Sequence, residues 1–409
     1  MRNWDKEYVL EDLLKENIFS LDRGRVISSI DIAKCPGIFP VYSSSVQKNG
    51  LFGYYDKFDF DEELITWSVD GGGYFFYRPK HKFSVTNVSG ILKINKPELF
   101  DYKFLYYNLA FQHASQYYDY SDKAHPSVIK KRYLIPEISL SEQQTIASIL
   151  SKLDEAISQT EQLIEKYKRI KEGLMNDLLT RGIDEHGNIR TEETHKFKDS
   201  PMGRIPEEWE VVPFETYYKS PIRDFGSFSS TKLITFLEEG IPFIKSEMIE
   251  ENNINWESVS FISYDVHKLL TKSYVNKNNI LFSKIGSALG KAAIYNGEYL
   301  NCNSNAAVAK IDIDNNLALN KYVCAFLNST FAKNQFSFMI ISLLPRINLG
   351  DINKLLIFKL PVEEQSRIIH KLNKTQNLID NTTDLISKLT SQKSGLMNDL
   401  LTGKVRVKI

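Results

Sequence analysis

The residues that could perform chemistry in this sequence fall into arrangements that are each incomplete. The stretch Gly286–Ala292 approaches a phosphate-binding P-loop, but three residues rather than four separate its glycines, and Ala292 stands where a Ser or Thr would hold magnesium. Glu98, Asp101 and Lys103 suggest a nuclease set only faintly, because the acidic side chains are crowded into the expected start of a helix. Neither stretch supports nucleotide hydrolysis or DNA cleavage by this chain.

Metal and methyl-transfer chemistry also lack their usual residues. The seven histidines form no HxxxH or HExxH pattern, and Cys35, Cys302 and Cys324 show no CxxC spacing, which argues against a zinc site and a disulfide framework. No two of the 13 prolines are adjacent, so the Asn-Pro-Pro-aromatic motif of amino-methyltransferases is absent. We therefore expect a chain with no catalytic residues, no metal site and no cofactor of its own.

The composition is typical of a globular protein with two to four domains. The 409 residues include 42% hydrophobic and 25% charged side chains, and 51 basic residues balance 51 acidic ones. This excludes a uniformly basic nucleic-acid coat, although a local basic patch could still bind phosphates. The start lacks the apolar run of a signal peptide, and no apolar run reaches the ~20 residues of a membrane span, so we expect a cytoplasmic protein.

An internal repeat divides the sequence into two similar halves. The string GLMNDLLT occurs at Gly173–Thr180 and again at Gly395–Thr402, an offset of 222 residues. Extending this offset back to Glu142 without a gap gives 19 identities in 39 positions. The chain is thus a tandem in the order domain, helix, domain, helix.

Both repeated segments are expected to form long helices with a coiled-coil seam, because seam residues recur at alternating steps of four and three, the 3.5-residue average of a heptad. Two equal stripes are better explained by pairing with each other than by separate packing of each stripe on its own domain. The two seams are Ile146, Leu150, Leu153, Ile157, Thr160, Ile164, Tyr167, Lys171, Leu174 and Leu178, and Ile368, Leu372, Thr375, Ile379, Thr382, Ile386, Leu389, Lys393, Leu396 and Leu400.

The identical octapeptide is expected to bind two copies of one partner. Packing between helices tolerates exchanges such as Leu to Met, so identity in two places beside diverged domains indicates a surface that each partner copy must find. The alternative is a shared structural demand where each helix ends, at Leu-Thr-Arg-Gly and Leu-Thr-Gly-Lys. The candidate partner-binding residues are Gln143, Gly173, Leu174, Asn176, Asp177, Gln365, Gly395, Leu396, Asn398 and Asp399.

The parts outside the helices have the pattern of two α+β domains with one fold. Short runs rich in Val, Ile, Tyr and Phe alternate with Gly, Asn, Asp and Ser. Ile38–Ser43 corresponds in position to Ile241–Ser246, and Glu63–Ser68 corresponds to Asn279–Lys284. The expected division is a first domain at 1–134, a helix at 135–182, an exposed linker at 183–204, a second domain at 205–356, and a helix with a tail at 357–409.

Loops rich in Gly, Ser, Asn and Lys at the ends of these strands are the candidate DNA-binding surface. Such loops let the backbone approach a phosphate and let amide side chains address base edges. For any one residue, a plain turn is the competing explanation. The candidates are Ser44, Ser45, Lys48, Asn49, Gly72, Gly73, Arg78, Lys123 and His125 in the first domain, and Lys245, Ser246, Lys284, Gly286, Ser287, Lys291, Asn303, Ser304, Asn305, Arg346 and Asn348 in the second.

Together these features resemble the DNA-specificity subunits of type I restriction-modification enzymes. The matching motifs are Ile205-Pro-Glu-Glu-Trp209 at the start of the second domain, Ile138–Gln144 and Leu360–Gln365 leading into the helices, and the tail from Leu400 to Val407. The resemblance covers essentially the whole chain. The first domain departs from the pattern, because only Trp4 stands for the Ile-Pro-x-x-Trp motif, and its exact start is left open.

The resemblance implies that each variable domain is a target-recognition domain for one half of a bipartite, asymmetric DNA site, and that the helices pair antiparallel as a spacer. Antiparallel pairing about the seam midpoint predicts that Thr160 lies close to Thr382. Two methylation subunits are then implied as partners on the repeated helical segments, and restriction subunits can be added. S-adenosylmethionine, ATP and magnesium are expected on those partners, which this chain directs to methylate adenine and to cleave.

Two other classes of function stay open at this point. A coiled-coil scaffold whose α+β domains bind proteins or glycans fits the zero net charge, and it would lack salt-sensitive binding to duplex DNA. A self-sufficient methyltransferase or nuclease would need the cofactor loop and the carboxylate set that are missing from the sequence.

Overall fold

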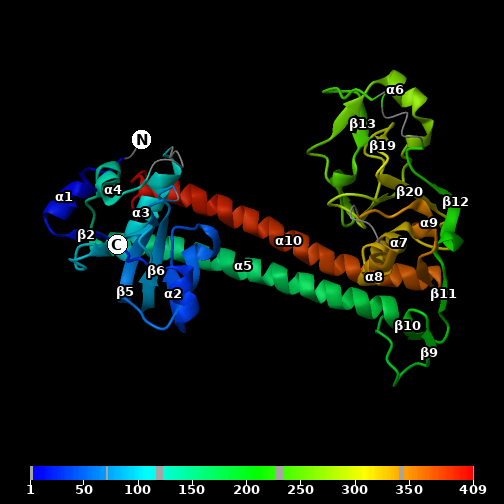
Figure 1. The fold of residues 1–409 in the computed structure, drawn as a ribbon, viewed down its shortest axis with the longest axis horizontal. Coiled ribbons are helices and arrows are strands. Elements are labelled where there is room, and N and C mark those ends of the chain that lie inside the picture. The colour runs from blue at the N-terminus through cyan, green and yellow to red at the C-terminus, as the bar shows by residue number, and fades with distance from the viewer. Residues whose placement is uncertain are drawn as a thin grey trace. The chain divides into compact units, whose positions relative to one another are not determined.

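The computed structural model describes residues 3–70, 72–116, 123–226, 232, 234–339 and 345–408. The chain forms two compact units: unit 1 contains Met1–Leu163 with Thr382–Ile409, and unit 2 contains Ile164–Asn381. Each unit combines one variable domain with one end of each of two long helices, α5 (Leu140–Thr180) and α10 (Val362–Leu401), which Figure 1 draws in green and red.

Unit 1 is built on a six-stranded sheet with the strand order β2-β7-β5-β6-β3-β4. All neighbouring strands are antiparallel except β3 and β6, which are parallel. A separate pair joins β1 and β8. The elements are β1 (Glu7–Val9), α1 (Leu10–Lys15), β2 (Phe19–Arg23), α2 (Ser29–Lys34), β3 (Pro36–Tyr42), β4 (Leu51–Tyr55), β5 (Phe60–Ser68), β6 (Phe75–Val85), β7 (Ser89–Ile94), α3 (Tyr102–Ala114), α4 (Pro126–Arg132) and β8 (Leu134–Pro136).

Helix α3 connects the sheet of unit 1 to the long helices. Its sequence is apolar on more than one side, which is typical of a helix that is buried on two faces. Leu105 and Leu109 join the core of the sheet, whereas Phe104 packs with Leu150 of α5 and Leu400 of α10. Figure 1 shows α3 beside the C-terminal end of α10. Helix α3 therefore contributes side chains both to the core of the sheet and to the core on the long helices.

Unit 2 repeats the arrangement with shorter strands, in two sheets ordered β12-β20-β17-β18 and β16-β13-β19. Strand β13 is antiparallel to one neighbour and parallel to the other, as β3 is in unit 1. The elements are β9 (Phe197–Ser200), β10 (Gly203–Pro206), β11 (Glu210–Pro213), β12 (Tyr218–Arg223), β13 (Ile241–Ile244), β14 (Ile249–Glu250), β15 (Asn253–Ile254), β16 (Ser260–Ile262), α6 (Tyr264–Leu269), β17 (Ile280–Ser283), β18 (Ala292–Ile294), β19 (Asn303–Ser304), β20 (Val308–Ile313), α7 (Asn320–Leu327), α8 (Thr330–Met339), α9 (Leu349–Asn353) and β21 (Leu356–Lys359).

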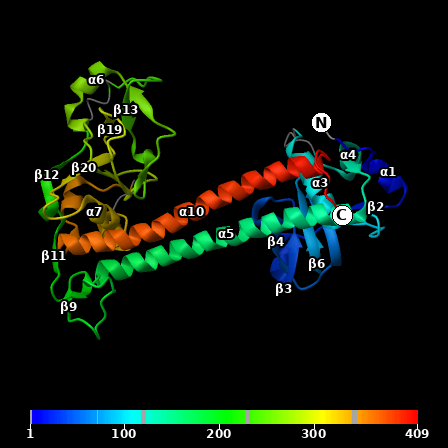
Figure 2. The same cartoon turned by 180° about the vertical axis from the view of Figure 1, so that it is seen from behind.

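The predicted correspondence between the two domains is confirmed by these strands. The segments matched in the sequence lie on β3 and β13 in one case and on β5 and β17 in the other, at equivalent places in the strand order. Helix α7 takes the place of α3, and its Phe326 packs with Leu372 of α10 in the core of unit 2. Figure 2 shows α7 beside α10 from the opposite side.

The two long helices run antiparallel, as the resemblance implied. In unit 1, Lys393 Nζ lies 2.5 Å from Asp154 Oδ1, and in unit 2, Lys171 Nζ donates to Gln376 Oε1 at 2.6 Å. Lys171 and Lys393 are counterparts at the 222-residue offset, and so are Asp154 and Gln376. The same seam contact is therefore made once in each unit.

The register of this pairing differs from the predicted one. The contact between Asp154 and Lys393 brings Thr160 to the level of Ser387, which is about five residues, or ~7.5 Å along the axis, beyond Thr382. Both threonines are buried in unit 1, with exposed fractions of 9% and 8%. They thus belong to the seam but face different partners, because the period of a heptad does not fix which turns lie opposite each other.

Each long helix begins with a buried carboxylate that an arginine holds. Arg406, which follows the end of α10, donates to Glu142 Oε1 and Oε2 at 2.7 and 2.6 Å. Arg190, which follows the end of α5, donates to both carboxylate oxygens of Glu364. The segment expected to be an exposed linker is therefore partly ordered: Arg190 is buried, and β9 and β10 form a hairpin further along it.

Each long helix ends at a glycine that a tryptophan covers. Gly182 and Gly403 have φ of +67° and +74°, and a Cβ would lie 2.4 Å from the Trp209 ring at the first and 2.8 Å from the Trp4 ring at the second. The indole of Trp4 also donates to Leu401 O at 3.1 Å. Trp4 thus has in unit 1 the position that the tryptophan of the Ile-Pro-Glu-Glu-Trp motif has in unit 2.

Candidate nucleic-acid interface

The loop between β3 and β4 presents the candidate residues of unit 1 to solvent. Ser45, Lys48 and Asn49 are exposed, and Ser44 is half-buried. The ends of the loop are closed by Ser43 N, which donates to Gly50 O at 2.8 Å. Gln47, which lies in the same Gly/Ser/Asn/Lys-rich loop, is also exposed between these candidates. The loop is therefore a polar projection whose two ends are joined by a backbone hydrogen bond.

The remaining candidates of unit 1 lie at other parts of the sheet. Gly72 and Gly73 form the turn between β5 and β6 but are buried, which corrects the prediction that they contact DNA. At this turn Lys123 approaches Asp70 at 3.5 Å, and His125 is half-buried just before α4. The parallel pairing of β3 with β6 brings Tyr42 beside Val85, at the opposite end of β6 from this turn. The structure therefore separates the predicted residues into two groups.

Arg78 lies beneath the loop between β3 and β4 and is not exposed. The side chain is 1% exposed, and its NH1 donates to Asn49 O at 2.8 Å and its Nε to Thr66 Oγ1 at 3.0 Å. Burial lowers the pKa of Arg78 to about 10, so the guanidinium is still charged at neutral pH. Direct DNA contact by Arg78, which the sequence suggested, is incorrect for this conformation, because the protein encloses the group.

In unit 2, several candidates gather where β17 ends. Gly286 and Ser287 are exposed, and the adjacent Ile285 pairs with the exposed Arg346. The exposed Asn348 follows, with its side chain bound to Asp351 at the start of α9. Lys291 and Asn305 are half-buried. The segment after Asn305 is joined to the end of β17 by Lys284 N, which donates to Ala307 O at 2.7 Å. This edge is the candidate reading surface of unit 2.

Other candidates of unit 2 are internal, which corrects the prediction for them. Asn303 and Ser304 are fully buried on β19, and Asn303 Nδ2 bonds to Leu270 O while its Oδ1 lies 2.5 Å from His267 Nδ1. Ser246 is 8% exposed, whereas Lys245 is half-buried with Nζ 4.4 Å from the Phe236 ring centre. The Asn-rich stretch is therefore a short buried strand and not a loop.

Lys284 is buried as well, within a cluster of charges that the sequence did not reveal. Lys284 Nζ donates to Asp224 Oδ2 at 2.7 Å, and Lys310 Nζ donates to Asp224 O at 2.8 Å. Burial lowers the pKa of Lys310 to about 8. For Asp224, burial alone would raise the pKa, but hydrogen bonds from Lys284 and from the Gly226 amide lower it overall. The position of Lys310 inside the largely apolar run Val308–Ile313 could have indicated this buried charge from the sequence.

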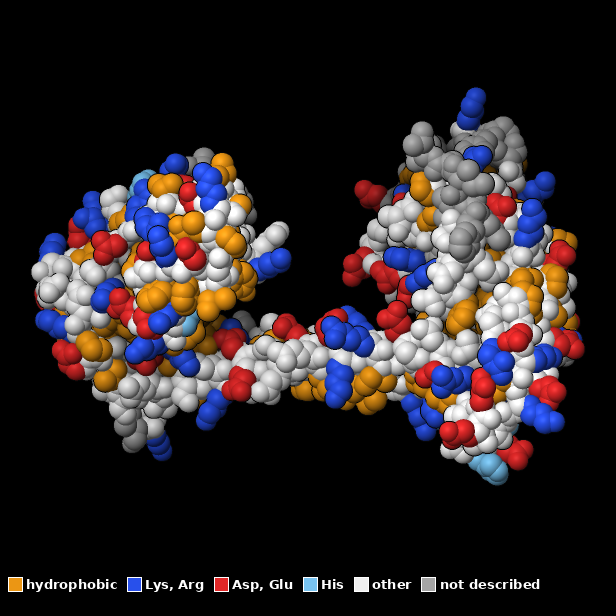
Figure 3. Space-filling model, turned by 60° about the horizontal axis from the view of Figure 1, so that its bottom comes forward, with side chains coloured by type: hydrophobic (Ala, Val, Ile, Leu, Met, Phe, Trp, Pro, Cys, Tyr) orange, Lys and Arg blue, Asp and Glu red, His pale blue; other side chains and the backbone are white. Residues whose placement is uncertain are grey.

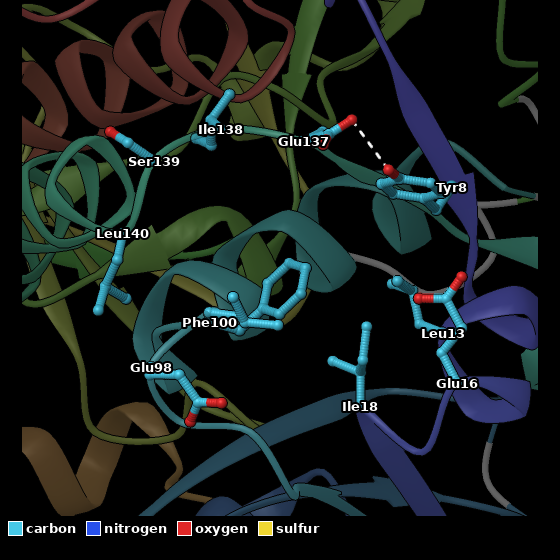
Figure 4. A pocket seen from close by; sticks show the side chains of 11 residues that line it. Tyr8, Leu13, Glu16, Ile18, Glu98, Phe100, Glu137, Ile138, Ser139 and Leu140 are labelled. Atoms are coloured by element: carbon cyan, nitrogen blue, oxygen red, sulfur yellow. Dashed lines mark hydrogen bonds between the residues drawn. The ribbon is translucent and has the colours of Figure 1, made fainter.

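A pocket in unit 1 has the wrong charge for DNA. It measures about 480 Å³ and lies between α1, the loop before α3 and the start of α5. Figure 4 shows the carboxylates of Glu16, Glu98 and Glu137 around a centre that Ile18 and Phe100 form. Because carboxylates repel phosphates, this pocket is no part of a nucleic-acid interface.

Charge on the surface is mixed in both units. Figure 3 shows basic and acidic side chains interspersed over the visible face of each unit, so no face visible there is basic throughout. Within the ranges that the structure describes, no three His, Cys, Asp or Glu side chains gather in a way that could hold a metal ion. In the same ranges, no helix has the length and apolar character to cross a membrane.

Two of the predicted partner-binding residues have an internal role, which corrects the prediction. Gln143 and Gln365 are 1% and 0% exposed. Gln143 donates to Leu99 O and accepts from Asp101 N, and Gln365 donates to Leu317 O and accepts from Leu319 N. Each glutamine thus ties the first turn of a long helix to the loop before α3 or α7, and its amide is fully used within its unit.

The other predicted partner-binding residues lie on the last turns of α5 and α10. Gly173, Gly395 and Asn398 are exposed, Asp177 and Asp399 are half-buried, and Leu174 and Leu396 pack partly against the cores. Asn176 differs from its counterpart, because its Oδ1 accepts from Thr330 in unit 2. A Cβ at Gly173 or Gly395 would meet no other atom within 4 Å. The glycines, unlike the buried leucines at the ends of the octapeptides, are not required by packing inside the described chain.

Known proteins are similar to this chain in sequence. The family model for the type I restriction modification DNA specificity domain matches residues 7–169 and 215–391. The type I restriction enzyme MjaVIII specificity subunit of Methanocaldococcus jannaschii is 28% identical over 400 residues, which cover 91% of this chain and 87% of that protein.

Solved structures agree at the level of the fold. The S subunit of a type I restriction-modification system from M. genitalium superposes with a TM-score of 0.59 at 17% identity, over 100% of this chain and 97% of that one. A chain from a solved type I R-M system gives 0.58 at 16% identity, over 98% of both chains. Because the family model matches once in each half and most of the sequence is covered, the chain belongs to the family of type I restriction-modification DNA specificity subunits.

Proposed function

We propose that this chain recognises a bipartite, asymmetric DNA site, with unit 1 reading one half-site and unit 2 reading the other. The observation that carries the proposal is the repetition of one strand order in two domains whose loops differ in sequence, within a chain of the specificity family. Different loops on equivalent frameworks suit two different half-sites. The antiparallel helices would set the distance and phase between the half-sites.

The exposed candidates are the residues proposed to contact DNA. In unit 1 they are the projection between β3 and β4 and, at the turn between β5 and β6, Lys123; in unit 2 they follow β17 and precede α9. Backbone, Ser and Lys groups would hold phosphates, and amide side chains would address base edges. The proposed contacts are Ser45, Lys48, Asn49, Lys123, Gly286, Ser287, Arg346 and Asn348.

Two copies of a methylation subunit are the proposed partners, one for each repeated helix end. The exposed glycines Gly173 and Gly395, with the aspartates four residues later, offer each copy an equivalent surface. S-adenosylmethionine would be bound by the methylation subunits, and ATP and magnesium by restriction subunits where these join. This chain would hold DNA in register in the cytoplasm while a partner turns the target adenine out of the duplex.

The proposal is tested by mapping adenine methylation in cells that carry the methylation subunit encoded beside this chain, with and without the chain. We expect a bipartite methylated motif that requires the chain, and exchange of one recognition domain should change one half of the motif only. If the two proteins assemble with an active methylation subunit and no chain-dependent motif appears, the proposal fails and a scaffold that binds other ligands is favoured.

A further inference from the structure

The projection between β3 and β4 has a backbone conformation that needs support. Lys48 and Asn49 are consecutive non-glycine residues with φ of +49° and +54°, and Gly50 follows with φ of +79°. Residues other than glycine seldom adopt this left-handed backbone conformation, and two such residues in succession persist only where surrounding groups hold them. The conformation turns Lys48 and Asn49, together with Gln47, outward to solvent.

Arg78 supplies that support from beneath the loop. Its NH1 binds the carbonyl of Asn49, its Nε binds Thr66 on the neighbouring strand β5, and its guanidinium carbon lies 3.7 Å from the centre of the Tyr42 ring. Gly50 leaves room for the group, since a Cβ there would lie 3.0 Å from Arg78 NH2. One planar side chain thus connects the strained loop to two strands of the sheet.

The energetics of Arg78 do not favour a role in stability alone. The group is 1% exposed, its NH2 has no hydrogen-bond partner, and the described residues provide it with no salt bridge. Burying a cation without a counter-ion is unfavourable, and an apolar side chain of similar volume would fill such a site at lower cost. What arginine alone provides is a rigid fork that binds the sheet and the loop carbonyl at the same time.

We propose that Arg78 is a positioning residue for sequence reading, which fixes the conformation in which Gln47, Lys48 and Asn49 meet the half-site of unit 1. The inference rests on the proposed function and assigns the specificity of that half-site to this loop. Arg78 acts through the loop, because its own donors are enclosed. Gln and Asn amides pair with adenine and Lys with guanine in the major groove, so the loop suits purine edges.

The test compares Arg78→Gln and Arg78→Lys with the unchanged chain, each assembled with its methylation subunit. Binding is measured to duplexes that carry base changes in one half-site at a time. We expect discrimination at the half-site of unit 1 to fall at least about 10-fold, and discrimination at the half-site of unit 2 to stay within about 2-fold. Arg78→Lys retains the charge without the fork, so it should show the same loss.

A milder pair of variants keeps the test valid if Arg78 variants fail to fold. Thr66→Val removes the hydroxyl that accepts from Arg78 Nε and keeps the shape of the side chain. It should weaken discrimination at the half-site of unit 1 by about 3-fold. The matched control is Thr86→Val, since Thr86 is equally buried in the same unit but its hydroxyl has no hydrogen-bond partner. The control should leave both half-sites unchanged.

The outcomes separate this inference from the proposed function. Folded, assembled Arg78 variants with undiminished discrimination at the half-site of unit 1, or with equal losses at both half-sites, would overturn the role of Arg78. Rescue by Arg78→Lys would also overturn it, because charge and not the fork would then be responsible. A wild-type complex that reads no bipartite site would instead refute the proposed function itself.

Discussion

Each unit buries a cation near a loop that is predicted to read DNA, but the two units neutralise that charge differently. In unit 1, Arg78 lies under the projection between β3 and β4 without a salt-bridge partner among the described residues. In unit 2, Lys284 and Lys310 are 7% and 6% exposed and share Asp224. The two domains thus bury cations on different strands of similar frameworks, and only unit 2 provides a carboxylate for them.

A similar framework of strands therefore does not determine the electrostatics beneath the candidate reading loops. Burial lowers the pKa of Arg78 only to about 10 and that of Lys310 to about 8. The cation of unit 1 is therefore fixed throughout the physiological pH range, whereas Lys310 loses its proton in mild alkali. The buried lysines of unit 2 should respond to pH and to loss of the Asp224 carboxylate, whereas the charge of Arg78 should not change in this pH range.

The largest effect is expected when the Asp224 carboxylate of unit 2 is removed, which Lys284 binds directly and which also stabilises the charge of Lys310. Asp224→Asn keeps the acceptor for the Gly226 amide but leaves two buried lysines without a counter-ion. Breaking a buried pair costs about 3–5 kcal/mol, and we expect about 3 kcal/mol because the Asp224 side chain is 25% exposed. The free energy of unfolding, from urea denaturation of the full chain, measures this.

The matched control is Asp199→Asn. Asp199 pairs with Arg204 at 3.3 Å, but both side chains are largely in water, so no measurable change is expected. If Asp224→Asn were as mild as this control, the lysines would not depend on the carboxylate, and the contrast between the units would disappear.

A smaller effect is expected from the titration of Lys310. Its pKa is lowered chiefly by burial and also by Lys284 and Arg223, while Asp224 acts in the opposite sense. Between the folded value of about 8 and the ordinary value of 10.5, the unfolded chain binds more protons than the folded chain. The free energy of unfolding should therefore rise with pH in this range, by about 2 kcal/mol from pH 8 to pH 9.5.

Lys310→Met isolates this contribution from the other titrating groups. The difference in the free energy of unfolding between the wild type and Lys310→Met should shift in favour of the wild type by that amount as the pH rises from 8 to 9.5. Below pH 10, tyrosines with raised pKa values, such as Tyr217 and Tyr322, stay protonated in the folded chain. A constant difference over this range would mean that Lys310 is already neutral or stays charged.

The sequence predicted the elements that follow from periodic side chains. The heptad seams and the repeat define α5 and α10, and runs of β-branched and aromatic residues define β3, β5, β13 and β17. The seam could not give the register, because every layer of a heptad resembles the next. The contact of Asp154 with Lys393 decides it, and that pair is visible only once the helices are side by side.

The candidate site was predicted less well, because residue type does not distinguish an exposed amide from a buried one. Gln143 and Gln365 are identical in both halves for an internal reason: a glutamine amide can donate to one backbone group of a loop and accept from another. Asn303 was taken for a loop residue since β19 has only two residues, too few to show alternation. Lys310 was missed because only loops were considered as places for cations.

The smallest change in stability is expected in unit 1, from Arg78→Met, which removes the buried cation of that unit. The substitution removes two hydrogen bonds and the contacts of the guanidinium with the Tyr42 and Phe76 rings, and it leaves Thr66 Oγ1 and Asn49 O without these donors, which is unfavourable. It also removes the cost of burying a cation without a counter-ion, and these terms oppose each other. The free energy of unfolding should change by less than about 1 kcal/mol, with an unchanged urea dependence. A loss of stability as large as that of Asp224→Asn would show that the guanidinium of Arg78 is as strongly stabilised as the lysines of unit 2. Arg78 would then be explained by its contribution to the stability of the sheet, and not by a role in DNA reading.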